Sequence, residues 1–274
     1  MPLDQEEEKT GTEMSFLDHL EALRWHLIRS AIAIVLLGSL AFIFKDLIFD
    51  GVLLAPKYDT FPTYRFFCWL SQVVFHNDSI CLQNLNFELI SIEMSGQFSA
   101  HIMVAFMTGL VLSFPYLLWE VWRFLKPALY DKERKAANGM VFFSSLLFAL
   151  GISFGYFVIT PLSVYFFGNY QVSGLVANQI SLNSFISTVA ATTFGTGVVF
   201  ELPIVIYFLA KIGLVGPAFL RKTRKVSYVI ILVLSAIITP PDVTSQIIVS
   251  IPLFILYEIS IYIAARVEKQ RLAT

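Results

Sequence analysis

The segment Phe114–Lys135, FPYLLWEVWRFLKPALYDKERK, separates two long apolar stretches and decides how the chain is arranged. Residues 98–118 upstream are almost entirely apolar, and so are residues 136–161 downstream. The segment between them is rich in Lys and Arg and contains Pro127, which interrupts a helix because it lacks a backbone N–H. Since loops rich in Lys and Arg stay in the cytoplasm, we expect a cytoplasmic loop between two transmembrane helices.

The composition is that of a membrane protein. Of the 274 residues, 57% are hydrophobic and 14% are charged, whereas soluble domains carry about 25% charged residues. The net charge of −1 and the lack of a basic stripe with interleaved aromatic residues give no indication of nucleic-acid binding. None of the common catalytic, phosphate-binding or metal-binding motifs occurs in the sequence. We therefore expect no enzyme, no cofactor and no metal site.

The apolar segments predict an all-α polytopic membrane protein with one six-helix domain, residues 15–265, whose last two spans are short. An acidic disordered tail, residues 1–14, precedes this domain, and a basic cytoplasmic tail, residues 266–274, follows it. Val226–Ile238 is only roughly 20 Å long as a helix, so a re-entrant hairpin over residues 226–265 is an alternative to two spans. Either arrangement leaves both termini in the cytoplasm. The expected spans are about 26–44, 97–118, 138–165, 182–209, 226–238 and 243–265.

Residues 45–95 form a long loop with few cations, which places it outside the cytoplasm. The loop contains both cysteines of the chain, Cys68 and Cys81. A disulfide between them fits an oxidising compartment. Two free buried thiols remain the alternative, because the sequence does not give the distance between them.

Two acids are predicted to lie inside the membrane, where ionisable residues are costly and are commonly functional. Glu201 lies near the bilayer centre, and Pro203 predicts a kink beside it. A protonated Glu201 that bonds to this kink is the structural alternative. Glu258 lies close to a helix end, where it can snorkel or pair with Arg266. A proton-coupled secondary transporter that uses Glu201 and Glu258 is therefore a second candidate function, whereas a protease using Ser99 or His101 lacks a supporting pattern.

Several separated motifs, in order, resemble the TatC family, the six-span receptor of the twin-arginine protein translocase. The resemblance covers about residues 15–265, and the motifs are HLEALR, LLAP, VWRFLKPALYDKERK, FELP and TPPDVTSQ followed by IPLFILYEI. It implies a receptor in the bacterial cytoplasmic (inner) membrane that binds twin-arginine signal peptides of folded cargo on the cytoplasmic face. It also implies self-association and assembly with single-span partners of the TatA and TatB types, which support export driven by the protonmotive force.

The resemblance also implies roles for particular residues. Glu201 corresponds to an intramembrane polar site near which a partner helix docks, and Glu133 is an acid in a loop rich in Lys and Arg. A carboxylate can pair bidentately with an arginine fork, which a lysine matches less well. The implied signal-peptide residues are Leu20, Glu21, Arg24, Phe124, Pro127 and Glu133, and the outer-face motif consists of Pro56, Asp242 and Gln246.

One position departs from the family pattern HLxELR. The glutamate that directly precedes Leu-Arg in the pattern is replaced by Ala22, and Glu21 comes one residue earlier. On a helix this shift rotates the side chain by about 100°. Either Glu21 substitutes from a neighbouring direction, or the N-terminal part of the arginine site is weaker in this chain.

Overall fold

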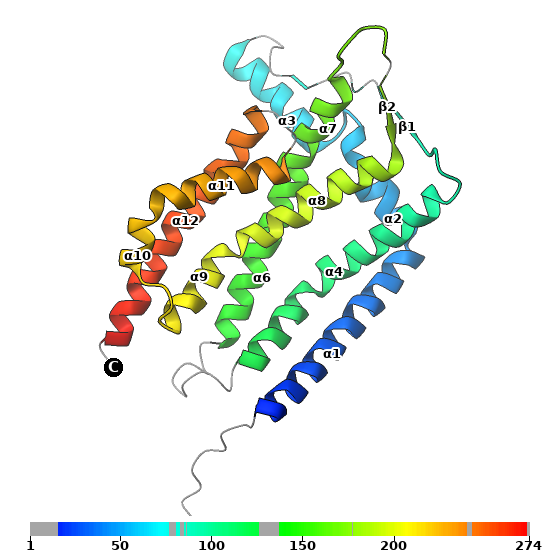
Figure 1. The fold of residues 1–274 in the computed structure, drawn as a ribbon. Coiled ribbons are helices and arrows are strands. Elements are labelled where there is room, and N and C mark those ends of the chain that lie inside the picture. Colours follow the sequence, from blue (N-terminus) through cyan, green and yellow to red (C-terminus); the bar gives the residue numbers. More distant parts are fainter. Residues whose placement is uncertain are drawn as a thin grey trace, which may run out of the picture.

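The computed structural model describes residues 16–76, 81–82, 85, 87–125, 137–176, 178–239 and 243–272. Over these residues the protein is a bundle of long helices with smaller elements across one end (Figure 1). The prediction of an all-α polytopic membrane protein is confirmed. Five helical segments of the described chain are long and apolar enough to cross a membrane, and they are Leu20–Ile43, Gly96–Phe124, Gly139–Asn169, Leu182–Lys211 and Ser245–Lys269.

Some of the long segments are single helices and others are built from pieces. The single helices are α1 (Phe16–Ile43), α4 (Gly96–Leu125), α11 (Arg224–Ile238) and α12 (Val243–Leu272), and a short α10 (Pro217–Lys222) precedes α11. The third span combines α6 (Ala137–Phe154), a π turn (Gly155–Ile159) and α7 (Thr160–Asn169), and the fourth combines α8 (Leu182–Phe200) and α9 (Leu202–Lys211). Helix α1 begins ten residues before the expected start of the first span and continues into it without a break.

The fifth span has the short length expected from the sequence. Helix α11 contains 15 residues, which is about 22 Å at 1.5 Å per residue, against a hydrocarbon core of about 30 Å. Helix α12 is different, because it contains 30 residues. Only the first of the two C-terminal helices is therefore short.

Residues 45–90, which we call the cap, lie at the end of the bundle opposite to the C-terminus (Figure 1). A two-stranded parallel sheet ties the cap to the chain before α8, with Glu88 opposite Gln179 and Ile90 opposite Ser181. The cap comprises α2 (Lys45–Ile48), a π turn (Phe49–Leu53), a 3₁₀ turn (Ala55–Lys57), α3 (Pro62–Leu70), a second π turn (Ser71–Phe75) and β1 (Glu88–Ile90), which pairs with β2 (Gln179–Ser181).

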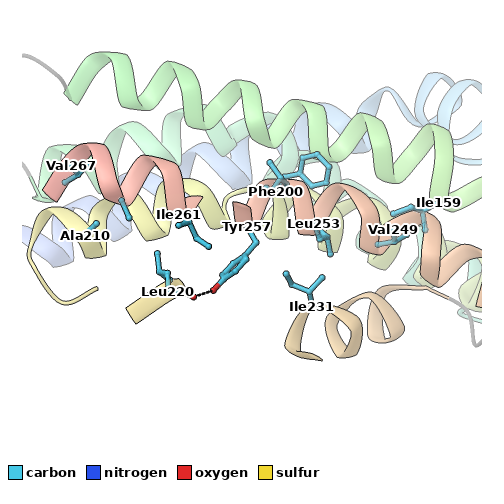
Figure 2. Packing of buried hydrophobic residues seen from close by; sticks show 12 residues of the cluster. Ile159, Phe200, Ala210, Leu220, Ile231, Val249, Leu253, Tyr257, Ile261 and Val267 are labelled. Atoms are coloured by element: carbon cyan, nitrogen blue, oxygen red, sulfur yellow. Dashed lines mark hydrogen bonds between the residues drawn. The ribbon is translucent and has the colours of Figure 1, made fainter. Parts of the chain in front are cut away.

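The main apolar core lies between α12 and its neighbours α9, α10 and α11 (Figure 2). Leu253 and Ile231 are buried at its centre. The Tyr257 hydroxyl donates a hydrogen bond of 2.9 Å to the Leu220 carbonyl oxygen, so that α10 is held against α12. Both C-terminal helices are therefore packed into the bundle rather than exposed on all sides.

Glycines allow the closest helix pairs to approach. A Cβ atom on Gly109 of α4 would lie 2.6 Å from the backbone nitrogen of Gly38 on α1, and one on Gly151 of α6 would lie 2.8 Å from the Cα of Gly197 on α8. Because lipid tails are as apolar as leucine, membrane helices associate through such close packing of small residues. The α1–α4 contact fixes the geometry of the site described below.

One boundary prediction is wrong. The segment Phe114–Lys135 was expected to leave the helix after Leu118, but α4 continues to Leu125. The side chains of Glu120 and Trp122 are buried within this extension. These tertiary contacts keep the chain helical where its charges alone indicated a loop.

Candidate functional site

The first part of α1 lies at the end of the bundle opposite to the cap (Figure 1). Three residues with predicted roles in signal-peptide binding, Leu20, Glu21 and Arg24, are exposed there. Ala22, at the position of the missing family glutamate, is half-buried. Glu21 therefore faces solvent or lipid, in a different direction from Ala22.

A buried polar cluster joins α1 to the last turns of α4. The Glu120 side chain is 1% exposed, and one of its carboxylate oxygens contacts Nδ1 of His26 on α1. Its other oxygen accepts a hydrogen bond of 2.8 Å from the Tyr116 hydroxyl. Both carboxylate oxygens are thus occupied, and the two helices are connected by a buried polar contact.

The end of α4 also contacts α1 through an aromatic pair. The ring of Phe124, a predicted signal-peptide residue, meets the His26 ring edge to face, with centroids 5.9 Å apart. Trp122 is buried on another side of α4, where it packs with Met140 and with Phe208 of α9. The two other predicted residues of this region, Pro127 and Glu133, lie outside the described residues.

Sequence analysis missed Glu120, His26 and Tyr116 as a cluster. Two signals were present: His26 begins an apolar stretch, and Glu120 follows Tyr116 at the four-residue spacing of one helix face. Glu120 follows the expected end of the span at Leu118, so it was not expected to lie within a packed helix.

Glu201 lies at the break between α8 and α9, so the kink predicted from Pro203 is confirmed. The residue is 8% exposed, and the Ser144 hydroxyl on α6 donates a hydrogen bond to one carboxylate oxygen. The other carboxylate oxygen is buried and has no hydrogen-bond partner among the described residues. The bonding partner is therefore a side chain on a neighbouring helix and not the kink itself.

Glu258 has partners other than the one expected. It was predicted to snorkel or to pair with Arg266, but it pairs with Arg224 at 2.8 Å, and the Tyr228 hydroxyl donates a 2.6 Å hydrogen bond to it. Both partners lie on α11. The hydrogen bonds described for Glu258 join it to α11 and not to Glu201, which is bonded by Ser144 of α6.

The predicted outer-face residues lie near the cap or at the end of α12 that adjoins it. Pro56 is buried in the cap, and its carbonyl oxygen accepts a hydrogen bond of 2.8 Å from the Tyr64 hydroxyl. The Gln246 amide on α12 donates a bond of 3.2 Å to the Leu232 carbonyl oxygen of α11. Asp242 lies outside the described residues. Cys68 and Cys81 are joined in a disulfide within the cap.

Comparison with known proteins assigns this architecture to a family. Residues 18–252 match the family described as Sec-independent protein translocase protein (TatC). The chain belongs to the TatC family. It is therefore a component of a protein translocase, and its long helices form the membrane-spanning fold of that family.

Individual TatC proteins match over nearly the whole chain. The TatC protein of Blattabacterium sp. subsp. Periplaneta americana is 40% identical over 261 residues, which cover 94% of this chain and 98% of that protein. The TatC protein of Aquifex aeolicus is 34% identical over 251 residues, which cover 91% and 94% of the two chains. A crystal structure of the twin arginine translocase receptor TatC is 34% identical and covers 90% of this chain and 97% of that chain, with a TM-score of 0.67.

Among the residues that the structure describes, no three His, Cys, Asp or Glu side chains lie close enough together to hold a metal ion. The buried acids Glu120 and Glu201 are instead paired with His26 and Ser144. These arrangements can position helices and bind polar groups.

Proposed function

We propose that this TatC-family chain is a receptor for twin-arginine signal peptides and binds them at the end of the bundle opposite to the cap. The observation that carries the proposal is the contact of α1 with the end of α4 through His26. This histidine contacts Glu120 and Phe124 at once. The contact brings the exposed Leu20, Glu21 and Arg24 on α1 beside the point where the loop with Pro127 and Glu133 begins.

The charge of the signal peptide complements this site. The two arginines of the peptide need carboxylates, and Glu133 with Glu21 supplies them in our proposal. A guanidinium pairs bidentately with a carboxylate and a lysine ammonium does not, which accounts for selection of paired arginines. We infer that this end faces the cytoplasm, because α4 ends there just before the Lys- and Arg-rich part of the sequence, and basic loops stay in the cytoplasm.

The family relatives are translocase subunits, and we infer that this chain also assembles with single-span partners of the TatA and TatB types. Glu201 supports a docking role, since one of its oxygens is buried without a described hydrogen-bond partner. A polar group of a partner helix would satisfy that oxygen. The chain would thereby couple cargo recognition at one end of the bundle to partner assembly within the membrane.

The test is the affinity of the purified chain for a twin-arginine peptide. Glu133→Gln removes the charge and keeps the shape, and we expect binding to weaken by about 1.5 to 3 kcal/mol, the range for hydrogen bonds to charged groups. Glu21→Gln is expected to cost less, because Glu21 points away from the direction of Ala22. A twin-lysine peptide should bind the unmodified chain weakly.

The matched control is Asp131→Asn, which neutralises another acid of the same loop. We expect it to leave the affinity unchanged, because the proposal assigns arginine binding to Glu133 specifically. Equal losses in the two variants would show that only the overall charge of the loop matters. Unchanged affinity in Glu133→Gln would remove the assignment altogether.

A further inference from the structure

Helix α3 in the cap buries two hydroxyl-bearing side chains, Thr63 and Tyr64, and exposes two large apolar ones, Phe66 and Trp69. Thr63, Tyr64 and, in the turn that follows, Ser71 are buried. On the opposite side, Phe66 is 55% exposed and Trp69 is 58% exposed. A helix on a water-facing surface shows the reverse arrangement, with apolar residues inside and polar residues outside.

Hydrogen bonds fix the inward side of α3 to a membrane-spanning segment. The Tyr64 hydroxyl donates a bond shared between the carbonyl oxygens of Pro56, at 2.8 Å, and Pro161, at 3.1 Å. The Thr63 hydroxyl donates to the carbonyl oxygen of Phe157. Burial, with a smaller contribution from the charge of Asp59, raises the pKa of Tyr64, so its hydroxyl remains a donor far into the alkaline range.

These anchors place α3 at the level of the lipid headgroups rather than in bulk water. Phe157 and Pro161 belong to the span Gly139–Asn169. Pro161 precedes the end of that span by eight residues, a distance of about 12 Å along a helix. Helix α3 runs crosswise to the long helices (Figure 1), which is the orientation of a helix that lies in the plane of a membrane surface.

The outward side of α3 continues the lipid-facing surface of the bundle. Phe157 in the span is 44% exposed. The buried Phe61, immediately before α3, stacks on it with ring centroids 5.9 Å apart and so holds the start of α3 beside this exposed part of the span. Arg65 is exposed next to Phe66. Aromatic rings prefer the boundary between headgroups and acyl chains, and an arginine beside them can reach lipid phosphates.

We propose that α3 is an interfacial membrane helix, whose face formed by Arg65, Phe66 and Trp69 is embedded in the lipid leaflet at the cap end. The disulfide joins Cys81 to Cys68, which follows Tyr64 at the spacing of one helix face and therefore does not occupy the side formed by Phe66 and Trp69. The partner of this surface is thus the lipid bilayer itself, and α3 attaches the cap to the membrane surface without a covalent lipid.

The experiment uses the full chain in phosphatidylcholine bilayers and measures tryptophan emission. The difference between the unmodified chain and Trp69→Phe isolates the emission of Trp69, while phenylalanine preserves the apolar character of the position. In lipid brominated close to the headgroups, we expect the Trp69 emission to fall at least twofold relative to unbrominated lipid. Iodide in the water should quench Trp69 much less than it quenches free tryptophan.

Trp122→Phe provides the matched control, because Trp122 is buried inside the bundle and its emission should resist iodide fully. Emission of Trp69 that is unaffected by brominated lipid and strongly quenched by iodide would overturn the proposal in favour of a water-exposed cap. Emission that resists both quenchers would also overturn it, since that result places another protein surface, such as a second copy of the chain, against α3.

Discussion

Two carboxylates connect two helix pairs of the bundle, and they do so with the same kinds of partner. Glu120 joins α4 to α1 through His26 and is also bonded by Tyr116. Glu258 joins α12 to α11 through Arg224 and Tyr228. Each acid therefore has one basic partner and one tyrosine hydroxyl.

The two sites differ in burial. The Glu120 side chain is 1% exposed, whereas that of Glu258 is 41% exposed. A buried acid that loses its partner keeps the full cost of desolvation, but an exposed acid is solvated again by water. Similar contacts should therefore contribute very different amounts to the free energy of unfolding. Only the packing of α1 against α4 should depend strongly on its polar contact.

The largest effect is expected for His26→Ala. It leaves Glu120 buried with only the Tyr116 hydroxyl as a partner, and breaking a buried pair in this way costs about 3 to 5 kcal/mol. We expect a corresponding loss in the free energy of unfolding, measured on the purified chain in detergent. Adding Glu120→Gln should recover part of the loss, because it removes the unpaired acid.

A loss in unfolding free energy below about 1 kcal/mol in His26→Ala, the upper range for exposed pairs, would contradict the difference proposed between the buried and the exposed acid. It would mean that water or another group reaches Glu120 once His26 is removed. In that case burial in the structure would not predict the energetic weight of the contact.

An intermediate effect is expected when each tyrosine loses its hydroxyl. Tyr116→Phe removes a donor to a buried carboxylate, at a cost of about 1.5 to 3 kcal/mol in unfolding free energy. Tyr228→Phe removes the same atom from an exposed site, and about 0.5 to 1 kcal/mol is expected there. The two variants are each other's control, because the chemical change is identical; equal losses would contradict the role assigned to burial.

Local rules in the sequence predicted part of this architecture. Long apolar runs indicated the helices, and Pro203 indicated the break at Glu201 because a proline removes one helical hydrogen bond wherever it occurs. Family motifs indicated the residues of α1 and of the loop after α4. These features depend on near neighbours along the chain or on motif spacing.

Features that depend on distant contacts were not predicted. The extension of α4 to Leu125 rests on burial of Glu120 against His26, which lies 94 positions earlier. The inward face of α3 rests on the bond from Tyr64 to Pro161, which lies 97 positions later. Likewise, Arg224 rather than Arg266 pairs with Glu258 because α11 folds back along α12. No local pattern specifies such partners.

The smallest effect is expected for Arg224→Ala, which removes the basic partner of Glu258. Water can solvate the half-exposed carboxylate, and the Tyr228 hydroxyl still donates to it, so the loss in unfolding free energy should be about 0.2 to 1 kcal/mol. Arg224→Lys should recover little of this, because a single ammonium lacks the planar fork of arginine. Raising the salt concentration should reduce the effect of Arg224→Ala, since exposed ion pairs are screened, but it should leave the effect of His26→Ala nearly unchanged. A salt-independent loss of several kcal/mol in Arg224→Ala would contradict this expectation. Glu258 would then depend on its basic partner as strongly as Glu120 does. Packing of α11 on α12, rather than exposure of the carboxylate, would then decide how much each ion pair contributes to the free energy of unfolding.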